Sequence, residues 1–330
     1  MAGLLNSAIQ VFDRYTYKGR TIVENQVIDD YNAKSNGAIV LERMAPEGEF
    51  EHMAGWNKVP DLMRNIDIQP DIGDETPVKL TEYDEKAVQV VHSSKTVSFE
   101  EIQIEVTNRD PATAGSAWGR QVGIAALRNK FNNAVAAAAG SILSAGLTGG
   151  LTLDKSGTTA SASNQINADM LLECSGIMGD HFQEIRSWLM HSQAFIRFAR
   201  NNLKDYQRLF QYKGVTVMED LFGKQFFITD DPSLQFSQNS LVKYRTFGLL
   251  EGAIKVYDPG YMRNNIQVNN KTRIETTLKT ESRFGLRVRG FGWNTQKYPT
   301  ILQVATTGNW TRTANTDNAD GPGVCLLHQV

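Results

Sequence analysis

One apolar pattern between Asp110 and Gly146 constrains the fold of this chain more than any other feature. Asp110 can cap a helix, Pro111 suits its first turn, and apolar residues then recur at steps of three and four, at Ile124, Leu127, Phe131, Val135, Ala138 and Ile142. The spacing predicts one helix of roughly 30 residues, about 45 Å long at 1.5 Å per residue. Since that is as long as a whole domain is wide, we expect this helix to be the spine of the fold.

The segment after the helix indicates a change of domain. In residues 144–163, fifteen of twenty are Gly, Ala, Ser or Thr, which favours a flexible loop. Further on, Asn167 is a suitable N-cap for a helix at 168–178, and Ser192 for another. The stretch EIRSWLMH (184–191) between them is typical of a short buried strand.

The remaining patterns are those of strands. VTVM (215–218) and QFFIT (225–229) flank a turn, as in a hairpin. Residues 274–289 alternate apolar and charged side chains, and residues 88–106 alternate too, with a slip between Phe99 and Ile102 that predicts a bulge. Helices and strands follow one another in separate groups, so the predicted fold class is α+β.

Three regions lack a regular pattern. Residues 1–50 show no sustained period, which favours an extended arm. Residues 60–86 contain three prolines and many acidic residues, as expected of an acidic, turn-rich excursion. The residues after Trp310 also lack apolar periodicity, so we expect a loose C-terminal tail.

Composition excludes several classes of protein. With 41% hydrophobic residues, the chain is not disordered. With 34 basic against 36 acidic residues, it is not a dedicated polyanion binder. No 18-residue apolar run exists, so we expect no membrane span, and the first twenty residues do not have the pattern of a secretory signal. The two cysteines lie far apart, which favours a reducing compartment without disulfides.

No catalytic, cofactor or metal motif is found in the sequence. Phosphate-cradling glycine loops, HExxH and GxSxG are all missing, and the five histidines are scattered. Asp29-Asp30 and Asp230-Asp231 are better explained as turn residues than as a paired acid site. Cys174 and Trp293 are expected to be core residues. We therefore predict no enzyme activity and no cofactor; an α+β enzyme with an unfamiliar site is the alternative from another class.

The order of these parts resembles the major capsid proteins of tailed bacteriophages, whose fold is shared with encapsulin shell proteins. The similarity covers about residues 50–310 and rests on segment order and on degenerate patterns. Four stretches carry it: MHSQAFIRFARNNL (190–203), GVTVMEDLFGKQFFITDDP (214–232), FGLLEGAIKVYD (247–258) and LKTESRFGLRVRGFGWN (278–294).

The resemblance implies a division of the chain into five parts. These are an N-terminal arm (1–50), an extended loop with its leading strand (51–105), a peripheral domain with the spine helix (106–160 and 263–300), an axial α+β domain (161–262), and a C-terminal strand and tail (301–330).

Charge is distributed unevenly among these parts. Residues 61–86 hold eight acidic and three basic residues. In contrast, residues 263–297 hold eight basic and two acidic residues, and residues 107–146 hold four basic residues and one acidic residue. Our hypothesis is that the acidic loop of one subunit lies across the basic helix-and-strand domain of its neighbour; ordinary solvated faces are the alternative. The expected inter-subunit contacts are Asp71, Asp74, Glu75, Asp84, Glu85, Arg120, Arg128, Lys130, Arg287 and Arg289.

The resemblance also implies a function. We expect a coat protein that self-assembles as hexamers and pentamers into the icosahedral head around double-stranded phage DNA, which it contacts non-specifically if at all. A separate scaffolding protein, a portal and a decoration protein are the expected partners, with assembly in the host cytoplasm and the virion capsid as the final location. An encapsulin-type shell of a cellular compartment is the alternative.

Overall fold

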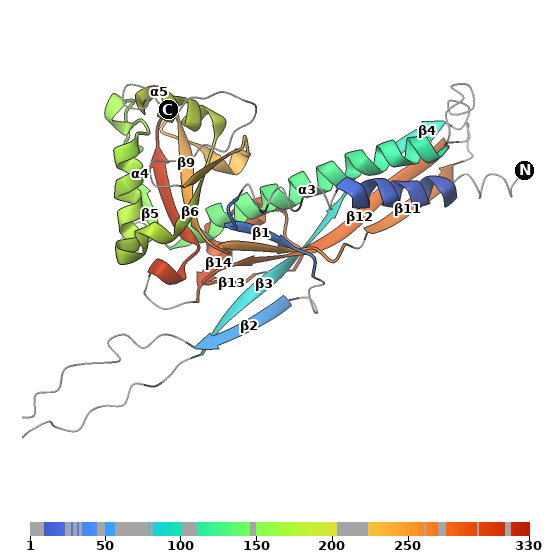
Figure 1. The fold of residues 1–330 in the computed structure, drawn as a ribbon, viewed down its shortest axis with the longest axis horizontal. Coiled ribbons are helices and arrows are strands. Elements are labelled where there is room, and N and C mark those ends of the chain that lie inside the picture. Colours follow the sequence, from blue (N-terminus) through green and yellow to red (C-terminus); the bar gives the residue numbers. More distant parts are fainter. Residues whose placement is uncertain are drawn as a thin grey trace, which may run out of the picture.

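The computed structural model describes most of the chain, with gaps at the N-terminus, in three longer internal stretches and in several short ones. The described residues are 10–23, 28, 32, 35–44, 50–56, 79, 82–100, 111–145, 150–202, 224–260, 262–269, 275–295, 297–313 and 318–330. The resulting body is elongated, with a group of short helices and strands at one end and a long helix along one side (Figure 1).

The spine helix is confirmed as α3, Pro111–Ser144, with 34 residues. Its C-terminal half is buried on all sides because the run from Ala134 to Ala139 lets neighbouring backbones come close. At Gly140 a β-carbon would lie 2.4 Å from the Val304 carbonyl oxygen, so only glycine allows this contact. The expected N-cap, Asp110, lies outside the described residues.

A nine-stranded sheet packs against α3, and one 14-residue strand, β12 (Glu275–Val288), organises it. Leu286 of β12 lies opposite Val256 on one edge and Val88 on the other. The strands of this sheet are β1 (Ile39–Glu42), β2 (Phe50–Trp56), β3 (Glu82–Ser93), β4 (Val97–Glu100), β10 (Ile254–Tyr257), β11 (Met262–Asn269), β12, β13 (Phe291–Trp293) and β14 (Trp310–Arg312).

The alternation expected at 274–289 is confirmed over β12. Leu278, Phe284, Leu286 and Val288 are all buried, and the even-numbered residues between them are buried too. The chain leaves the sheet at 94–96, between β3 and β4, and the bulge expected between Phe99 and Ile102 lies outside the described residues, because residues 101–110 are not described.

A six-stranded sheet forms the second unit, with its own apolar core. Its order is β5 (Thr152–Asp154), β15 (Gly323–His328), β9 (Leu241–Leu250), β6 (Ile185–Met190) and β7 (Gln225–Ile228), with β8 (Gln235–Gln238) also on β9. The helices α4 (Ala168–Ser175) and α5 (Ser192–Asn202) lie around this sheet (Figure 1). Short helices complete the fold: η1 (Ala162–Asn164), η2 (Gly176–Glu184), η3 (Pro232–Leu234), α6 (Ile301–Val304), η4 (Thr307–Asn309) and η5 (Asn318–Asp320).

Several local predictions for this unit are confirmed. Asn167 caps α4, its side chain accepting a hydrogen bond from the Met170 amide, and 185–190 is the buried strand β6. QFFI forms β7, which pairs in parallel with β6. Its expected hairpin partner, VTVM (215–218), lies outside the described residues.

The prediction of a loose C-terminal tail is wrong for the last residues of the chain. Residues 323–328 form β15, which is inserted between β5 and β9, and Val324, Cys325 and Leu326 are fully buried. The apolar run that forms β15 is short, and the polar residues before it hide it in the sequence pattern.

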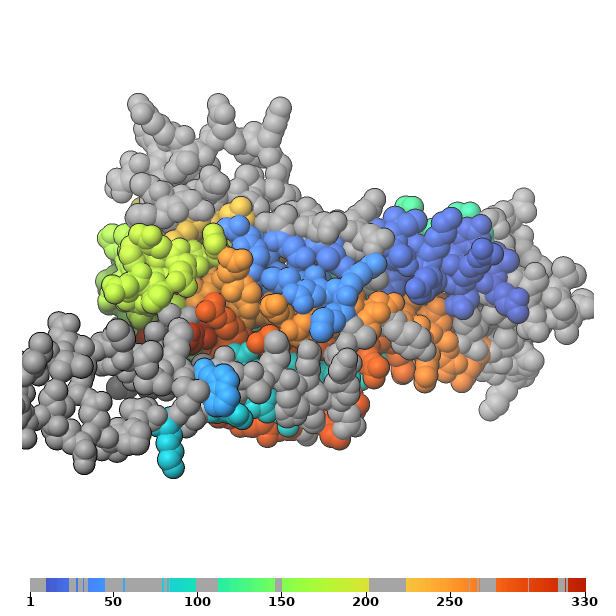
Figure 2. All heavy atoms as spheres, turned by 60° about the horizontal axis from the view of Figure 1, so that its bottom comes forward, coloured from blue at the N-terminus to red at the C-terminus, as the bar shows by residue number. Residues whose placement is uncertain are grey.

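The expectation of an extended N-terminal arm is wrong for two segments. Residues 10–23 are helical, and residues 39–42 form β1, paired in parallel with β10. The N-terminal helix runs parallel to α3 with close backbone contact: a β-carbon at Gly119 would lie 2.1 Å from the Thr16 carbonyl oxygen, and one at Gly115 would lie 2.6 Å from that of Phe12. Figure 2 shows this helix, in dark blue, against the orange residues of β11 and β12.

Candidate functional site

The described residues hold no cluster of side chains that could bind a metal ion. No three His, Cys, Asp or Glu side chains come together among them. Cys174 and Cys325 are both buried, and burial raises the pKa of each thiol, so neither is a reactive thiolate. Within the same part of the chain, no helix is long and apolar enough to span a membrane.

Two other sequence interpretations are confirmed as structural. Asp231 caps η3, accepting a hydrogen bond from the Ser233 amide, and Trp293 is a core residue packed edge-on against Trp310. The Asp29-Asp30 pair lies outside the described residues.

The most prominent surface feature is a projecting hairpin made of β2 and β3. The strands pair in register from Phe50 with Val88 to Trp56 with Glu82, and they leave the body on the side away from α3 (Figure 1). A hairpin that extends beyond its own domain has one face or edge open to a neighbouring molecule.

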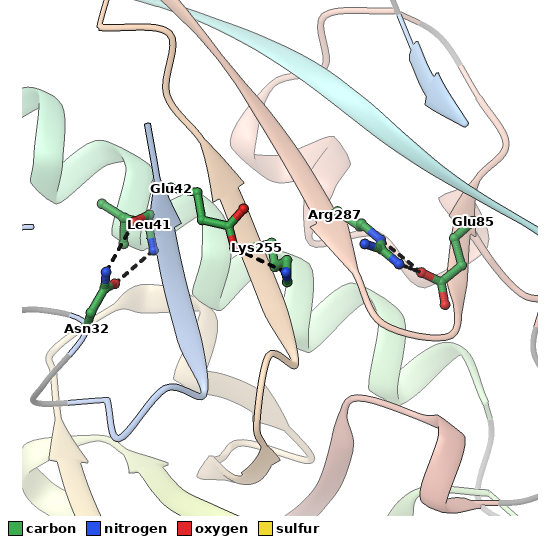
Figure 3. Close-up of polar contacts among 6 residues, drawn as sticks. All are labelled: Asn32, Leu41, Glu42, Glu85, Lys255 and Arg287. Atoms are coloured by element: carbon green, nitrogen blue, oxygen red, sulfur yellow. Dashed lines mark hydrogen bonds and ion pairs between the residues drawn. The ribbon is translucent and has the colours of Figure 1, made fainter. Parts of the chain in front are cut away.

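A buried ion pair fixes the base of this hairpin. The Arg287 Nε of β12 donates to Glu85 Oε2 of β3 at 2.9 Å, and the Gly290 amide donates to Glu85 Oε1 at 2.8 Å (Figure 3). Because both carboxylate oxygens are occupied and Glu85 is buried, the hairpin leaves the sheet in a defined direction.

A second set of polar contacts attaches the chain before the hairpin. Asn32 donates to and accepts from the backbone of Leu41, at 3.1 and 2.9 Å, and Lys255 pairs with Glu42 at 3.1 Å (Figure 3). The Asn32 bonds attach the preceding segment to β1, and the Lys255–Glu42 pair joins the C-terminal end of β1 to β10, so β1 is tied to the sheet that carries the hairpin.

The interior of the long body contains one fully buried ion pair between α3 and the end of β10. Lys130 Nζ donates to Asp258 Oδ2, and the two side chains are 0% and 1% exposed. Burial alone would raise the pKa of Asp258, but the charge and hydrogen bond of Lys130 and the Gly260 amide outweigh it and hold that pKa below its usual value.

Three of the expected inter-subunit residues are therefore reassigned. Glu85 and Arg287 do meet as opposite charges, but within one chain, because β3 and β12 are neighbours in the sheet. Lys130 is buried against Asp258, so it has no surface to offer a neighbouring subunit.

The other expected contacts lie at the surface or outside the described part. Asp84, Arg120 and Arg128 are exposed, and Arg289 is half-buried, near the Glu251 carbonyl. Asp71, Asp74 and Glu75 lie outside the described residues. Asp84 is on the hairpin, whereas Arg120 and Arg128 are on α3, so one chain holds the two charge types on different sides of the body (Figure 1).

One surface feature has no signal in the sequence. A pocket of about 330 Å³ opens between α3 and β7, lined mainly by Ile124, Leu127, Arg128, Phe131, Phe227 and Ile228. Phe131 and Phe227 are in contact, with ring centroids 4.8 Å apart. About a hundred residues separate its two walls, so no local pattern could have predicted it.

Two histidines, His328, which is buried, and His92, which is half-buried, predict a loss of stability in acid. Burial lowers the pKa of His328 to about 4, and burial, followed by the charge of Lys130, lowers that of His92 to about 4. Since the unfolded pKa is about 6.5, the native state binds fewer protons, and its stability falls as the pH drops from 6.5 toward 4, by at most about 3 kcal/mol per histidine. Urea unfolding of the subunit at pH 7 and pH 4.5 measures this.

Substitutions separate the histidine effect from general acid denaturation. His328→Gln is expected to reduce the loss of stability between pH 6.5 and pH 4, whereas His181→Gln, at an exposed histidine that pairs with Glu184, should retain that loss. Equal pH dependence in all three proteins would contradict the assignment.

Comparisons with known proteins agree with this architecture. Three phage shells are similar in fold: the capsid of Ralstonia phage GP4 (TM-score 0.53, 11% identity, 90% of this chain and 88% of that chain), the capsid asymmetric unit of cyanophage Pam1 (0.51, 12%, 86% and 85%) and the head of Helicobacter pylori bacteriophage KHP40 (0.51, 7%, 90% and 88%). None of the curated proteins matches this chain.

The α+β fold is thus shared with phage capsid proteins. A family model described as Gp13-like, major capsid protein 13-like, matches residues 8–325. A match over nearly the whole chain identifies it: this protein belongs to the Gp13-like family of major capsid proteins, the shell subunits of phage heads.

Proposed function

We propose that the chain assembles as hexamers and pentamers into a closed icosahedral shell around double-stranded DNA, with no chemical step of its own. The observation that carries this proposal is the β2–β3 hairpin, which projects from an elongated body while its base is fixed by the Glu85–Arg287 pair. Closed shells need subunits that grip their neighbours through such extensions, repeated by symmetry.

We further propose that the hairpin and its acidic loop lie on the basic side of a neighbour. Asp71, Asp74, Glu75 and Asp84 supply the negative charge, and Arg120, Arg128 and Arg289 the positive charge. Salt screens such contacts over about 8–10 Å, so assembly should slow as ionic strength rises. The five-part division from arm to C-terminal strand belongs to the same proposal, with 10–23, β1 and β15 folded into the body.

The expected partners follow from this function. A separate scaffolding protein directs curvature, a portal occupies one vertex, a decoration protein binds outside, and the shell forms in the host cytoplasm before it becomes the virion capsid. DNA is contacted non-specifically, if at all, because a chain with nearly balanced charge has little electrostatic attraction for a polyanion.

Reversal of the loop charges tests the proposal. Changing Asp71, Asp74, Glu75 and Asp84 to Lys, with Glu85 kept for its internal pair, is expected to abolish closed particles in negative-stain micrographs while thermal unfolding of the subunit is unchanged. The matched control reverses four exposed acids of the axial unit, Asp169, Glu173, Asp180 and Glu184.

The control should still form shells. Unimpaired shells from the loop variant would refute the charge contact, and a wild-type chain that forms no shell, alone or with its scaffolding protein, would refute the function itself.

A further inference from the structure

The β2–β3 hairpin presents an exposed aromatic side chain at the end of its described part. Trp56, at the outer described end of β2, is 59% exposed. A tryptophan side chain exposed to water lacks the favourable free energy that burial of its large apolar surface would provide. Buried tryptophans are over-represented among the residues that dominate protein interfaces. A binding site for this side chain is therefore expected on another molecule.

The pocket between α3 and β7 has the complementary features. Its floor is the Phe131–Phe227 contact, and Ile124 and Ile228 at its walls are 58% and 37% exposed. Its volume of about 330 Å³ is at the lower end of the range for small-molecule sites, which suits a single aromatic side chain. We propose that this pocket receives Trp56 of a second copy of the chain, an inference that rests on the proposed shell function.

Charge at the two surfaces favours this pairing. Glu82 lies directly opposite Trp56 in the hairpin, and Asp84 is two residues further along β3; both are exposed. Arg128, also exposed, lines the pocket. An apolar anchor beside acidic groups thus meets an apolar pocket beside a cation, which fixes the register of the contact as well as its partner.

The arrangement of the subunit lets the contact repeat. The hairpin leaves the body on the side away from α3 (Figure 1), so the end of β2 and α3 lie in different parts of the subunit. A head-to-tail contact of this kind closes into a ring when the rotation between copies is a simple fraction of a turn. The same contact then occurs once per subunit around each ring.

Leu302 is the main competitor for the pocket among the described residues. At 78% exposed it is the most exposed large apolar side chain there, but it lies in α6, next to Gln303 and without a neighbouring carboxylate. It offers no charge for Arg128. It therefore serves as the matched control.

Disulfide trapping in assembled shells tests the contact. The double variant W56C/I124C puts one thiol on the hairpin and one in the pocket, and the native thiols do not interfere because Cys174 and Cys325 are fully buried. After oxidation by air with a copper catalyst, we expect a ladder of linked chains on a non-reducing denaturing gel. The control L302C/I124C should give no ladder beyond dimers.

The outcomes distinguish this proposal from the shell function. Shells without a ladder, or with equal ladders in both variants, would overturn the pocket contact and leave the function intact. If the double variant itself fails to assemble, it is co-expressed with an equal amount of wild-type chain, and the same two gel patterns decide. An absence of shells from the wild-type chain alone or with its scaffolding protein would overturn the function and the contact together.

Discussion

Replacing Lys130 with methionine is expected to cost the subunit about 3–5 kcal/mol of stability, one of the largest effects of any single substitution in this chain. Methionine fills much of the same space, so little cavity is created, but the carboxylate of Asp258 stays buried without its ion-pair partner. The Gly260 amide, at 3.0 Å, and the charge of Arg20 compensate it only in part. Urea unfolding of the purified subunit, compared with wild type, measures the loss.

Two further variants test whether the cost comes from the stranded charge. Lys130→Met with Asp258→Asn removes both charges and should recover most of the stability, because a neutral pair needs no counter-ion. Lys255→Met breaks the Lys255–Glu42 pair, whose side chains are about one third exposed, and should cost less than about 1 kcal/mol. A double variant as unstable as Lys130→Met would contradict the explanation.

Truncation after Pro322 is expected to abolish cooperative folding of the unit that contains the six-stranded sheet. The missing residues include β15, which pairs with β9 at six positions and with β5 at three. Val324, Cys325 and Leu326 are buried, and burial of the two larger side chains, Val324 and Leu326, contributes about 1.5–3 kcal/mol each. This is a large part of the free energy of unfolding of a domain, which is about 5–15 kcal/mol. Circular dichroism during thermal unfolding and the yield of soluble protein measure the effect.

The matched control removes only Val330, which is 38% exposed and lies beyond the strand. It should melt like the full chain. A truncated chain that keeps the wild-type melting transition would mean that β9 and β5 do not need β15 between them.

The elements that could be predicted from the sequence are those whose partners are local or whose pattern is complete. The helix α3 carries an apolar period over its whole length, and β12 alternates without a change of phase from Leu278 to Val288. The Asn167 cap depends on only three residues of sequence. In each case the residues that decide the structure are close together in the chain.

The missed elements use contacts that leave no apolar pattern. The N-terminal helix buries Phe12 and Val23 at the ends of its inner face, but Thr16, Gly19 and Arg20 between them interrupt the hydrophobic period. The Glu85–Arg287 pair joins residues about 200 positions apart, and charge counting could predict that the two regions attract but not that they share one sheet. The α3–β7 pocket is likewise a product of tertiary packing.

The pairing pattern of β12 has a consequence for the order of folding. Its contacts with β10 and β11 close short loops along the chain, whereas β3 and β4 reach it from nearly 200 residues away. Short loops close at a lower entropic cost and therefore earlier. We expect the hairpin of β11 and β12 to nucleate the sheet and the N-terminal strands to join late. The extension that reaches a neighbour would then be secured only after the body that carries it has formed.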